Sequence, residues 1–200
     1  MKTLLLLALP LVAGAPFLAP TAAPQEAEMT EMAEMMKRAA RYTTPGPEHA
    51  LLERFVGDWD VEAVMLMGGQ ATPATQGTAT FAWKVPNRWL ESEWSGTLMG
   101  MPGQSFQTMG YDKLKQSYVW NHITTYDTAM NHAEGDLTPD GKALILYGTL
   151  DEYLTGEHDK LVKYVYRFLS DDSFVLEVHD LAIGETNTKV LEFRYARKEG

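Results

Sequence analysis

From Gly57 almost to the C-terminus, apolar and polar residues alternate with a period of two. The first run, DWDVEAVMLM, places Trp59 on one side and Asp60 on the other. Successive side chains of a β-strand point to opposite faces, so this period predicts strands with one buried and one solvated face. Turn sequences such as Pro102-Gly103 separate the runs. The predicted strands span residues 58–67, 75–85, 88–97, 104–112, 116–124, 130–138, 142–150, 160–169, 173–182 and 186–198.

About ten consecutive strands with short connections predict an up-and-down antiparallel sheet. An open sheet exposes two edges, and closure into a barrel removes both of them. The chain contains no cysteine, so its core must stabilise the fold without disulfides. We therefore predict a mainly β protein, an up-and-down antiparallel barrel of about ten strands preceded by one or two N-terminal helices.

The segment MKTLLLLALPLVAGA at the start of the chain is typical of a secretory signal peptide, with one lysine before a short apolar run. The run is shorter than the roughly 20 residues that span a bilayer. We expect its removal on export, which leaves a periplasmic or extracellular protein without a transmembrane anchor. The predicted organisation is a signal peptide at 1–23, a methionine-rich helix and linker at 24–46, and the barrel domain at 47–200.

The predicted helix before the barrel carries Met29, Met32, Met36 and Ala39 on one face. Thioethers suit soft copper ions, but no histidine or cysteine accompanies them, which favours packing over metal binding. The helix is also a possible contact surface for a protein partner. Nucleic acid is not expected as a partner, because the net charge is -10 and no Lys/Arg cluster offsets it.

The alternation also predicts which side chains face the barrel interior. In the run 160–169, Lys163 and Arg167 share one face, so Tyr164 and Tyr166 point inward. An aromatic interior with isolated hydroxyl groups is typical of a small-molecule pocket, and ten strands leave more room than eight. The alternative is a barrel filled by its own side chains. The predicted ligand-binding residues are Trp94, Tyr118, Trp120, His122, Tyr164 and Tyr166.

The sequence GDWDVEA resembles the Gly-x-Trp signature of calycin-type barrels, the lipocalin and fatty-acid-binding group. In those folds a basic residue of the last strand covers the tryptophan, which implies a cation–π contact between Arg197 and Trp59. With PGPEHALLERFVGDW, MGYDKLKQSYV and RYARK, residues Pro45 to Lys198 resemble the exported bacterial family called domain of unknown function 1579. The resemblance implies a calycin-like barrel and no settled activity, so it supplies no catalytic residues.

The nitrobindins, a related calycin branch, hold haem inside a ten-stranded barrel through one histidine. By this resemblance, the candidate haem ligands are His122, His132 and His179. His179 shares the outward face of its strand with Glu177, which disfavours it.

A second site hypothesis concerns the segment NHITTYDTAMNH at 121–132. A hairpin centred on Asp127 would place His122 opposite His132, with Glu134 on the same face. Two imidazoles and a carboxylate could hold a metal ion or act as a general base with its orienting acid. A register shift of one residue would separate the histidines to opposite faces, leaving an ordinary polar rim.

The sequence therefore favours an exported barrel that binds a small apolar or aromatic molecule in its interior, with His122 as a polar anchor. One alternative is a histidine-dependent metal- or haem-binding protein or enzyme that uses the 122–134 hairpin. Another is a filled barrel that acts as a protein-interaction module. The sequence assigns neither a reaction nor a cofactor.

Overall fold

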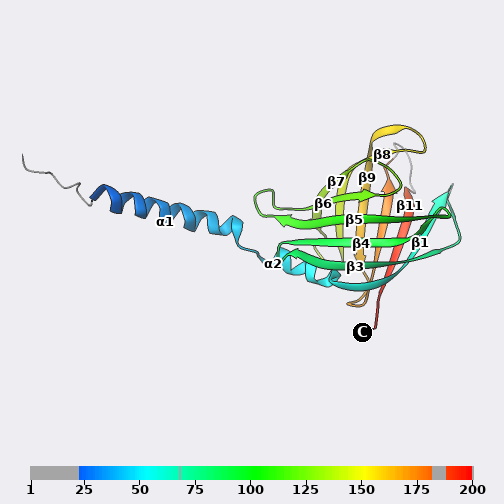
Figure 1. The fold of residues 1–200 in the computed structure, drawn as a ribbon, viewed down its shortest axis with the longest axis horizontal. Coiled ribbons are helices and arrows are strands. Elements are labelled where there is room, and N and C mark those ends of the chain that lie inside the picture. Colours follow the sequence, from blue (N-terminus) through cyan, green and yellow to red (C-terminus); the bar gives the residue numbers. More distant parts are fainter. Residues whose placement is uncertain (1–22, 68, 182–187, 200) are drawn as a thin grey trace, which may run out of the picture. The chain divides into compact units, whose positions relative to one another are not determined.

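The computed structural model describes residues 23–67, 69–181 and 188–199. The chain divides into two compact units, Met1–Ala40 and Arg41–Gly200. Most of helix α1 (Ala23–Thr43) belongs to the first unit, and the second contains the sheet (Figure 1). None of the helices in the described residues combines the length and hydropathy needed to cross a membrane.

Helix α1 confirms the helix that the methionine spacing predicts. Glu26 in its first turn and Arg41 in its last turn complement the helix dipole. The side chains of Met29, Met32 and Met36 are exposed. Their packing against another apolar surface, or against a protein partner, stays a prediction.

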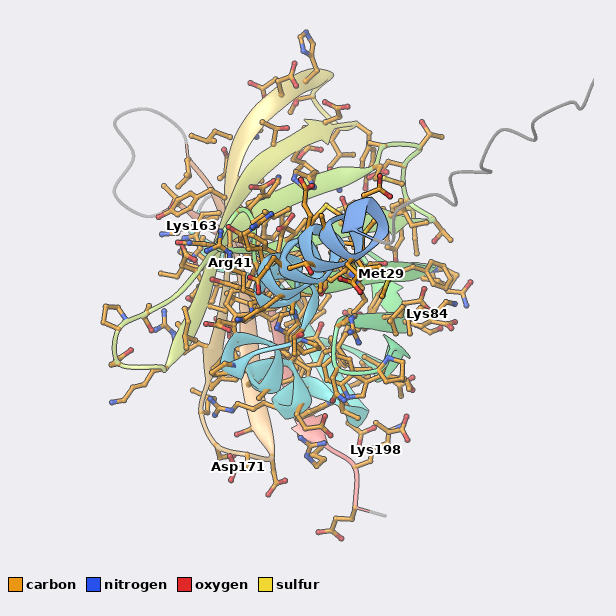
Figure 2. The ribbon with its side chains drawn as sticks, turned by 90° about the vertical axis from the view of Figure 1, so that its left-hand side faces the viewer. Met29, Arg41, Lys84, Lys163, Asp171 and Lys198 are labelled. Carbon is orange, nitrogen blue, oxygen red and sulfur yellow. The ribbon has the colours of Figure 1, made fainter. Side chains whose placement is uncertain are left out.

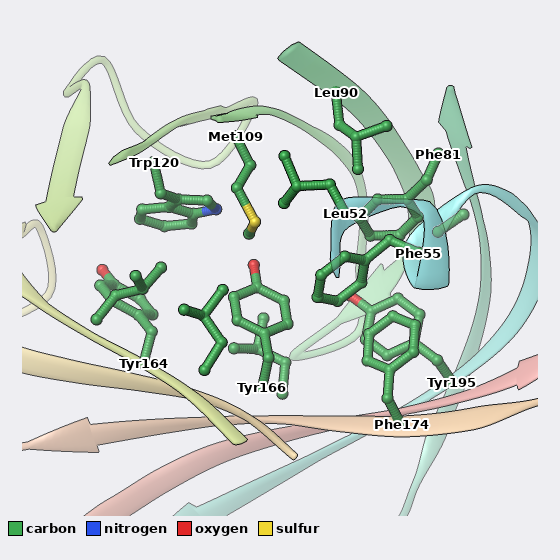
Figure 3. Packing of buried hydrophobic residues seen from close by; sticks show 14 of the residues in the cluster. Leu52, Phe55, Phe81, Leu90, Met109, Trp120, Tyr164, Tyr166, Phe174 and Tyr195 are labelled. Atoms are coloured by element: carbon green, nitrogen blue, oxygen red, sulfur yellow. The ribbon is translucent and has the colours of Figure 1, made fainter. Parts of the chain in front are cut away.

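A short helical segment precedes the sheet and supplies two core residues. It joins α2 (Pro47–Ala50) to the 3-10 helix η1 (Leu51–Phe55). The fixed φ of Pro47 suits the first helical turn. Leu52 and Phe55 lie three residues apart on η1 and are fully buried. Phe55 contacts the ring of Phe174 across the interior at 5.2 Å, so this segment closes one end of the barrel (Figure 3).

The sheet follows the chain in order. Its strands are β1 (Gly57–Met67), β2 (Gln70–Ala71), β3 (Thr75–Val85), β4 (Trp89–Leu98), β5 (Met101–Asp112), β6 (Ser117–Thr124), β7 (Asn131–Leu137), β8 (Ala143–Glu152), β9 (Glu157–Phe168), β10 (Ser173–Asp180) and β11 (Lys189–Arg197). The two-residue β2 pairs with β1, and β11 pairs back with β1. In the described residues, ten antiparallel strands thus close into a barrel, which confirms the predicted fold class.

Strand β5 begins earlier than predicted, because the turn before it precedes Pro102-Gly103. The turn residues are Met99 and Gly100, at φ angles of 53° and 76°. Positive φ at both central residues is the pattern of a type I′ hairpin turn. Gly103 lies within the strand, where a Cβ atom would be 2.3 Å from the ring of Tyr126. The turn prediction at Pro102-Gly103 is therefore wrong, and the glycine makes room for a tyrosine.

The predicted inward and outward faces are confirmed. Tyr164 and Tyr166 are buried, and so is Trp94 on β4. The paired residue of Lys163 on β10 is His179, which also belongs to the outer face of the barrel. Figure 2 shows the charged side chains around the outside of the strands, with Lys163 labelled. Alternation alone therefore places the aromatic side chains in the interior.

Candidate ligand-binding cavity

The barrel interior is packed at the end that η1 closes and hollow toward the other end. There the side chains surround a cavity of about 180 Å³. The two ends are distinguished by strand β6. The Tyr118 hydroxyl, near its start, donates to the backbone oxygen of Glu48 on α2 at 2.9 Å. Its other end leads to Tyr126 and Asp127, which line the cavity. The lining aromatic residues are Trp94, Trp120, His122, Tyr126, Tyr153, Tyr164, Phe193 and Tyr195.

Gln107 on β5 is the buried polar centre of this interior. Its Oε1 accepts hydrogen bonds from Nε1 of Trp120 at 3.0 Å and from the hydroxyl of Tyr166 at 2.8 Å. An indole N–H can only donate, so the amide oxygen must face Trp120. Nε2 then lies on the other side of the amide. This nitrogen has no hydrogen-bond partner in the described part of the chain, and other atoms do not cover it completely. It therefore faces the cavity that Gln107 lines.

His122 on β6 is a neutral, oriented imidazole in the cavity wall. Burial lowers its pKa to about 4. Its ring lies parallel to that of Trp120, with an interplanar angle of 5° and centroids 5.3 Å apart. Nδ2 of Asn131 lies 3.3 Å from Nδ1 of the imidazole and can only donate, which places the ring proton on Nε2. Nε2–H is unpaired among the described residues and accessible from the cavity.

The pairing predicted for His122 and His132 is wrong by one residue. His122 pairs with Asn131, and His132 pairs with Asn121. A shift of one residue reverses the faces, so His122 points inward and His132 points outward. The side chain of His132 is 51% exposed. The two histidines therefore do not form a common site.

The connection between β6 and β7 explains the shift. Oδ1 of Asp127 accepts from the backbone N–H of Ala129 at 3.0 Å, which makes a local turn after the aspartate. The hydroxyl of Tyr126 donates to the backbone oxygen of Met101 at 3.0 Å, and its ring covers Gly103. These contacts hold the centre of the hairpin between Tyr126 and Asp127 rather than at Asp127. Each of these residues can be read from the sequence, but the packing of Tyr126 on strand β5 cannot.

Glu134 belongs to an outer ion pair rather than to a metal site. It accepts from Nε2 of His132 at 3.0 Å and from Nζ of Lys115. The hydrogen bond from Lys115, and then that from His132, lowers the pKa of Glu134. In the described residues, no group of three or more His, Cys, Asp or Glu side chains could hold a metal ion. The predicted His122–His132–Glu134 constellation is therefore not formed.

The cavity has one acidic side chain and no lysine or arginine in its lining. The acid is Asp127, whose pKa is raised by burial and, to a smaller extent, by the charges of Asp151 and Glu152. Three hydroxyl groups in the cavity wall make no hydrogen bond to described residues and are not completely covered by other atoms: those of Ser105, Tyr164 and Tyr195. The cavity is thus apolar and aromatic, with a few unpaired polar atoms on its surface.

Residues 44–197 match the family described as "Protein of unknown function (DUF1579)". The chain belongs to the DUF1579 family. This confirms the resemblance seen in the Gly-x-Trp strand and its flanking motifs. No curated protein matches the chain.

Two solved structures show folds similar to this DUF1579 barrel. The structure of Rv2717c from M. tuberculosis has a TM-score of 0.58 and 13% identity, covering 78% of this chain and 99% of that one. The S-type phycobiliprotein lyase CPES from Guillardia theta has a TM-score of 0.48 and 12% identity, with 78% and 99% covered. At 13% identity, the likeness to Rv2717c concerns the fold alone, and it agrees with the predicted calycin-like barrel.

In the DUF1579 barrel, some of the predicted ligand-binding residues line the cavity and others do not. Trp94, Trp120, His122 and Tyr164 line the cavity. Tyr118 and Tyr166 do not belong to its lining. Tyr118 reaches α2 at the closed end, and Tyr166 supports Gln107 from within the core. Whether any of them binds a ligand stays a prediction.

Sequence reasoning missed Gln107 and Ser105, both in the cavity wall. On β5 the usual alternation is reversed, because Phe106 is 40% exposed while Gln107 is 8% exposed. The strand carries apolar residues of both parities, Phe106 and Met109, so alternation alone does not assign its inward face; the burial of Met109 does. Extending the parity of Met109 along the strand places a buried amide opposite His122.

The other candidate haem ligand, His179, lies on the outer face of the DUF1579 barrel as its sequence parity predicts. Its Nδ1 lies 3.1 Å from the hydroxyl of Thr188. Burial lowers the pKa of His179, and the charge of Lys163 lowers it further. His122 is therefore the one histidine of the three candidates that lines the cavity.

Proposed function

We propose that this DUF1579 protein binds a small apolar or aromatic molecule in the barrel cavity. The observation that carries the proposal is an aromatic cavity of about 180 Å³ at the open end of a packed barrel. An engineered apolar cavity of about 150 Å³ in another protein binds benzene. By that comparison, this cavity suits a ligand of one aromatic ring with a small substituent.

The energetic support is the apolar surface that a ligand would remove from water. Burial contributes roughly 25 cal/mol for each Å² of apolar surface. Trp94 and Phe193 already pack edge to face at 5.8 Å, and Trp120 lies 4.5 Å from Tyr164, so the walls are ordered by their own contacts. A pre-formed site spends little binding energy on ordering side chains.

The same geometry weakens the alternatives. The cavity argues against a barrel filled by its own side chains. The metal hypothesis required His122 and His132 on the same face of the sheet, and they lie on opposite faces. A haem group has four pyrrole rings and exceeds a cavity that suits a single ring. Contact with a protein partner through α1 remains a separate proposal, supported by the exposed side chains of Met29, Met32 and Met36.

Export completes the proposal. We infer it from the leading lysine and short apolar run within residues 1–23, most of which lie outside the described residues. Expression of the full chain in a bacterial host, followed by intact mass analysis of the periplasmic fraction, tests it. We expect a chain shortened by cleavage near residue 23. A full-length chain confined to the cytoplasm would contradict export.

The binding proposal is tested with a neutral fluorescent probe of a single aromatic ring, 4-(dimethylamino)benzonitrile, and with native mass spectrometry of gently purified protein. We expect saturable probe binding that small aromatic molecules displace. Val178→Trp places an indole into the cavity lining and should abolish binding. Val175→Trp, on the outer face of the same strand, is the matched control and should bind the probe like the unchanged protein. A folded protein that binds neither probe nor small aromatic would exclude the function.

A further inference from the structure

We propose that the cavity selects neutral aromatic molecules that carry a carbonyl group, which Gln107 and His122 bind with two adjacent hydrogen-bond donors. The inference rests on the proposed ligand-binding function and adds the chemical class of the ligand.

The register of strands β5 and β6 places the two donors next to each other. Gln107 on β5 and His122 on β6 are direct partners in the antiparallel register. Directly opposed residues have Cβ atoms about 4.5–5.5 Å apart and project from the same face of the sheet. Both side chains line the cavity. One acceptor atom of a ligand can therefore lie within reach of both.

Trp120 fixes the orientation of both donors. Its indole N–H occupies Oε1 of Gln107, and the same ring stacks in parallel against the imidazole of His122. The hydroxyl of Tyr166 donates a second hydrogen bond to Oε1. Turning the amide over would place its N–H against the indole N–H of Trp120, where neither group can accept, so the amide nitrogen stays on the cavity side. An unpaired donor pre-set in this way favours an acceptor over an apolar group.

The imidazole presents a donor rather than an acceptor. Asn131 donates to Nδ1, so the neutral ring carries its proton on Nε2. The depressed pKa keeps the ring neutral at pH 7. A carbonyl oxygen has two lone pairs and can accept from Gln107 Nε2–H and His122 Nε2–H together.

The charges around the cavity favour a neutral ligand. A carboxylate would meet no lysine or arginine in the lining, and it would meet Asp127. Burying an ionised carboxylate without a cationic partner is costly, and two neutral donors compensate only part of that cost. A hydrocarbon of the same shape would leave both donors unpaired. A ketone or an aldehyde on a single aromatic ring satisfies them.

The test compares three ligands of similar size: ethylbenzene, acetophenone and benzoate. Their dissociation constants are measured at pH 7.5 by titration of ¹⁵N-labelled full-length protein followed by NMR. Each neutral hydrogen bond contributes between about twofold and tenfold to affinity. We expect acetophenone to bind about tenfold more tightly than ethylbenzene, and benzoate to bind most weakly.

Two variants assign the preference to these residues. His122→Phe keeps a ring beside Trp120 and removes Nε2–H, while Gln107→Glu keeps an oxygen for Trp120 and replaces the amide donor. Either variant should reduce the preference for acetophenone over ethylbenzene to about threefold or less. Phe106→Leu, on the outer face of β5, is the matched control and should keep the preference. If Gln107→Glu fails to fold, His122→Phe alone decides the assignment.

The outcomes separate this inference from the function on which it rests. Equal affinity for ethylbenzene and acetophenone would overturn the carbonyl class and leave the apolar-ligand function intact. Tightest binding by benzoate would overturn the requirement for a neutral ligand. A preference unchanged in His122→Phe would overturn the role of His122. Absence of binding by all three would overturn both the inference and the proposed function.

Discussion

The guanidinium of Arg197 lies 4.2 Å from the centroid of the Trp59 ring, and the two residues are direct partners where β11 closes on β1. The guanidinium also donates to the backbone oxygens of Val56 at 2.6 Å and Arg54 at 3.1 Å. One side chain of the last strand thus fastens the segment that leads from η1 into the first strand. The resemblance to calycin barrels implied the cation–π contact, and the structure adds the hydrogen bonds.

Replacing Arg197 by alanine should lower the free energy of unfolding by about 2–4 kcal/mol, because it removes a cation–π contact and charge-assisted hydrogen bonds. Arg197→Lys should recover only part of the loss, since an ammonium lacks the planar fork of donors. Urea denaturation measures both. The control is Lys198→Ala, which removes an exposed contact to Asp60 at 3.6 Å and should cost less than about 1 kcal/mol. Equal losses for Arg197→Ala and Lys198→Ala would contradict the fastening role.

Phe55→Ala should lower the free energy of unfolding by about 3–5 kcal/mol, because Phe55 is fully buried against several aromatic rings at the closed end. Phe106→Ala removes the same side chain from the outer face and should cost about 1 kcal/mol or less. Thermal and urea unfolding of the two variants provide the comparison. A small effect at Phe55 would show that η1 does not close the barrel in solution.

Gln107→Leu should lower the free energy of unfolding by about 2–4 kcal/mol, because it strands the indole N–H of Trp120 and the hydroxyl of Tyr166 without acceptors. Combining it with Tyr166→Phe should cost less than the sum of the single changes, since the second removes a group that the first left unpaired. A double-mutant cycle by urea denaturation measures this coupling. Gln104→Leu, on the exposed side of β5, is the control, and strict additivity would argue against the buried network.

The pH dependence of stability should reflect the burial of His122. Its pKa of about 4 lies below the ordinary value of 6.5, so the unfolded chain binds more protons between these values. Its contribution is fully present above pH 6.5 and is lost as the pH falls toward 4. The full contribution is about 3 kcal/mol, at roughly 1.4 kcal/mol for each pH unit. The lowered pKa values of His49 and His179 act in the same direction, and the raised pKa of Asp127 acts in the opposite one.

Two measurements isolate the His122 contribution. An NMR titration of the imidazole should give a midpoint near pH 4, and His122→Phe should flatten the loss of stability between pH 6.5 and 4. A midpoint near 6.5 would show that the ring is solvated rather than held in the cavity wall.

The observed register predicts different effects for the two histidines of the 122–132 segment. His132→Phe should leave probe affinity unchanged, because His132 lies on the outer face beside Glu134. His122→Phe alters the cavity wall and should change that affinity by about threefold or more. Fluorescence titration compares the two. Equal effects would be inconsistent with histidines on opposite faces.

Much of this architecture follows from local sequence patterns. Period-two alternation predicted the strands, their buried faces and the inward Tyr164, because a strand turns each side chain by half a revolution from its neighbour. The closing pair of Trp59 and Arg197 came from family resemblance together with the parity of the last strand. The turn at Met99-Gly100 was missed because Pro102-Gly103 has the stronger local composition, and only Tyr126 explains the glycine there.

The sequence by itself determined a closed β-barrel with an aromatic interior, since alternation and short connections depend on neighbouring residues alone. Only the tertiary structure decided that His122 faces Gln107 and not His132. Strand register depends on contacts between distant segments, here the packing of Tyr126 on Gly103 and the turn after Asp127. A shift of one residue moves a side chain to the other face, so this small difference replaces a metal-site hypothesis with a cavity carrying two oriented donors.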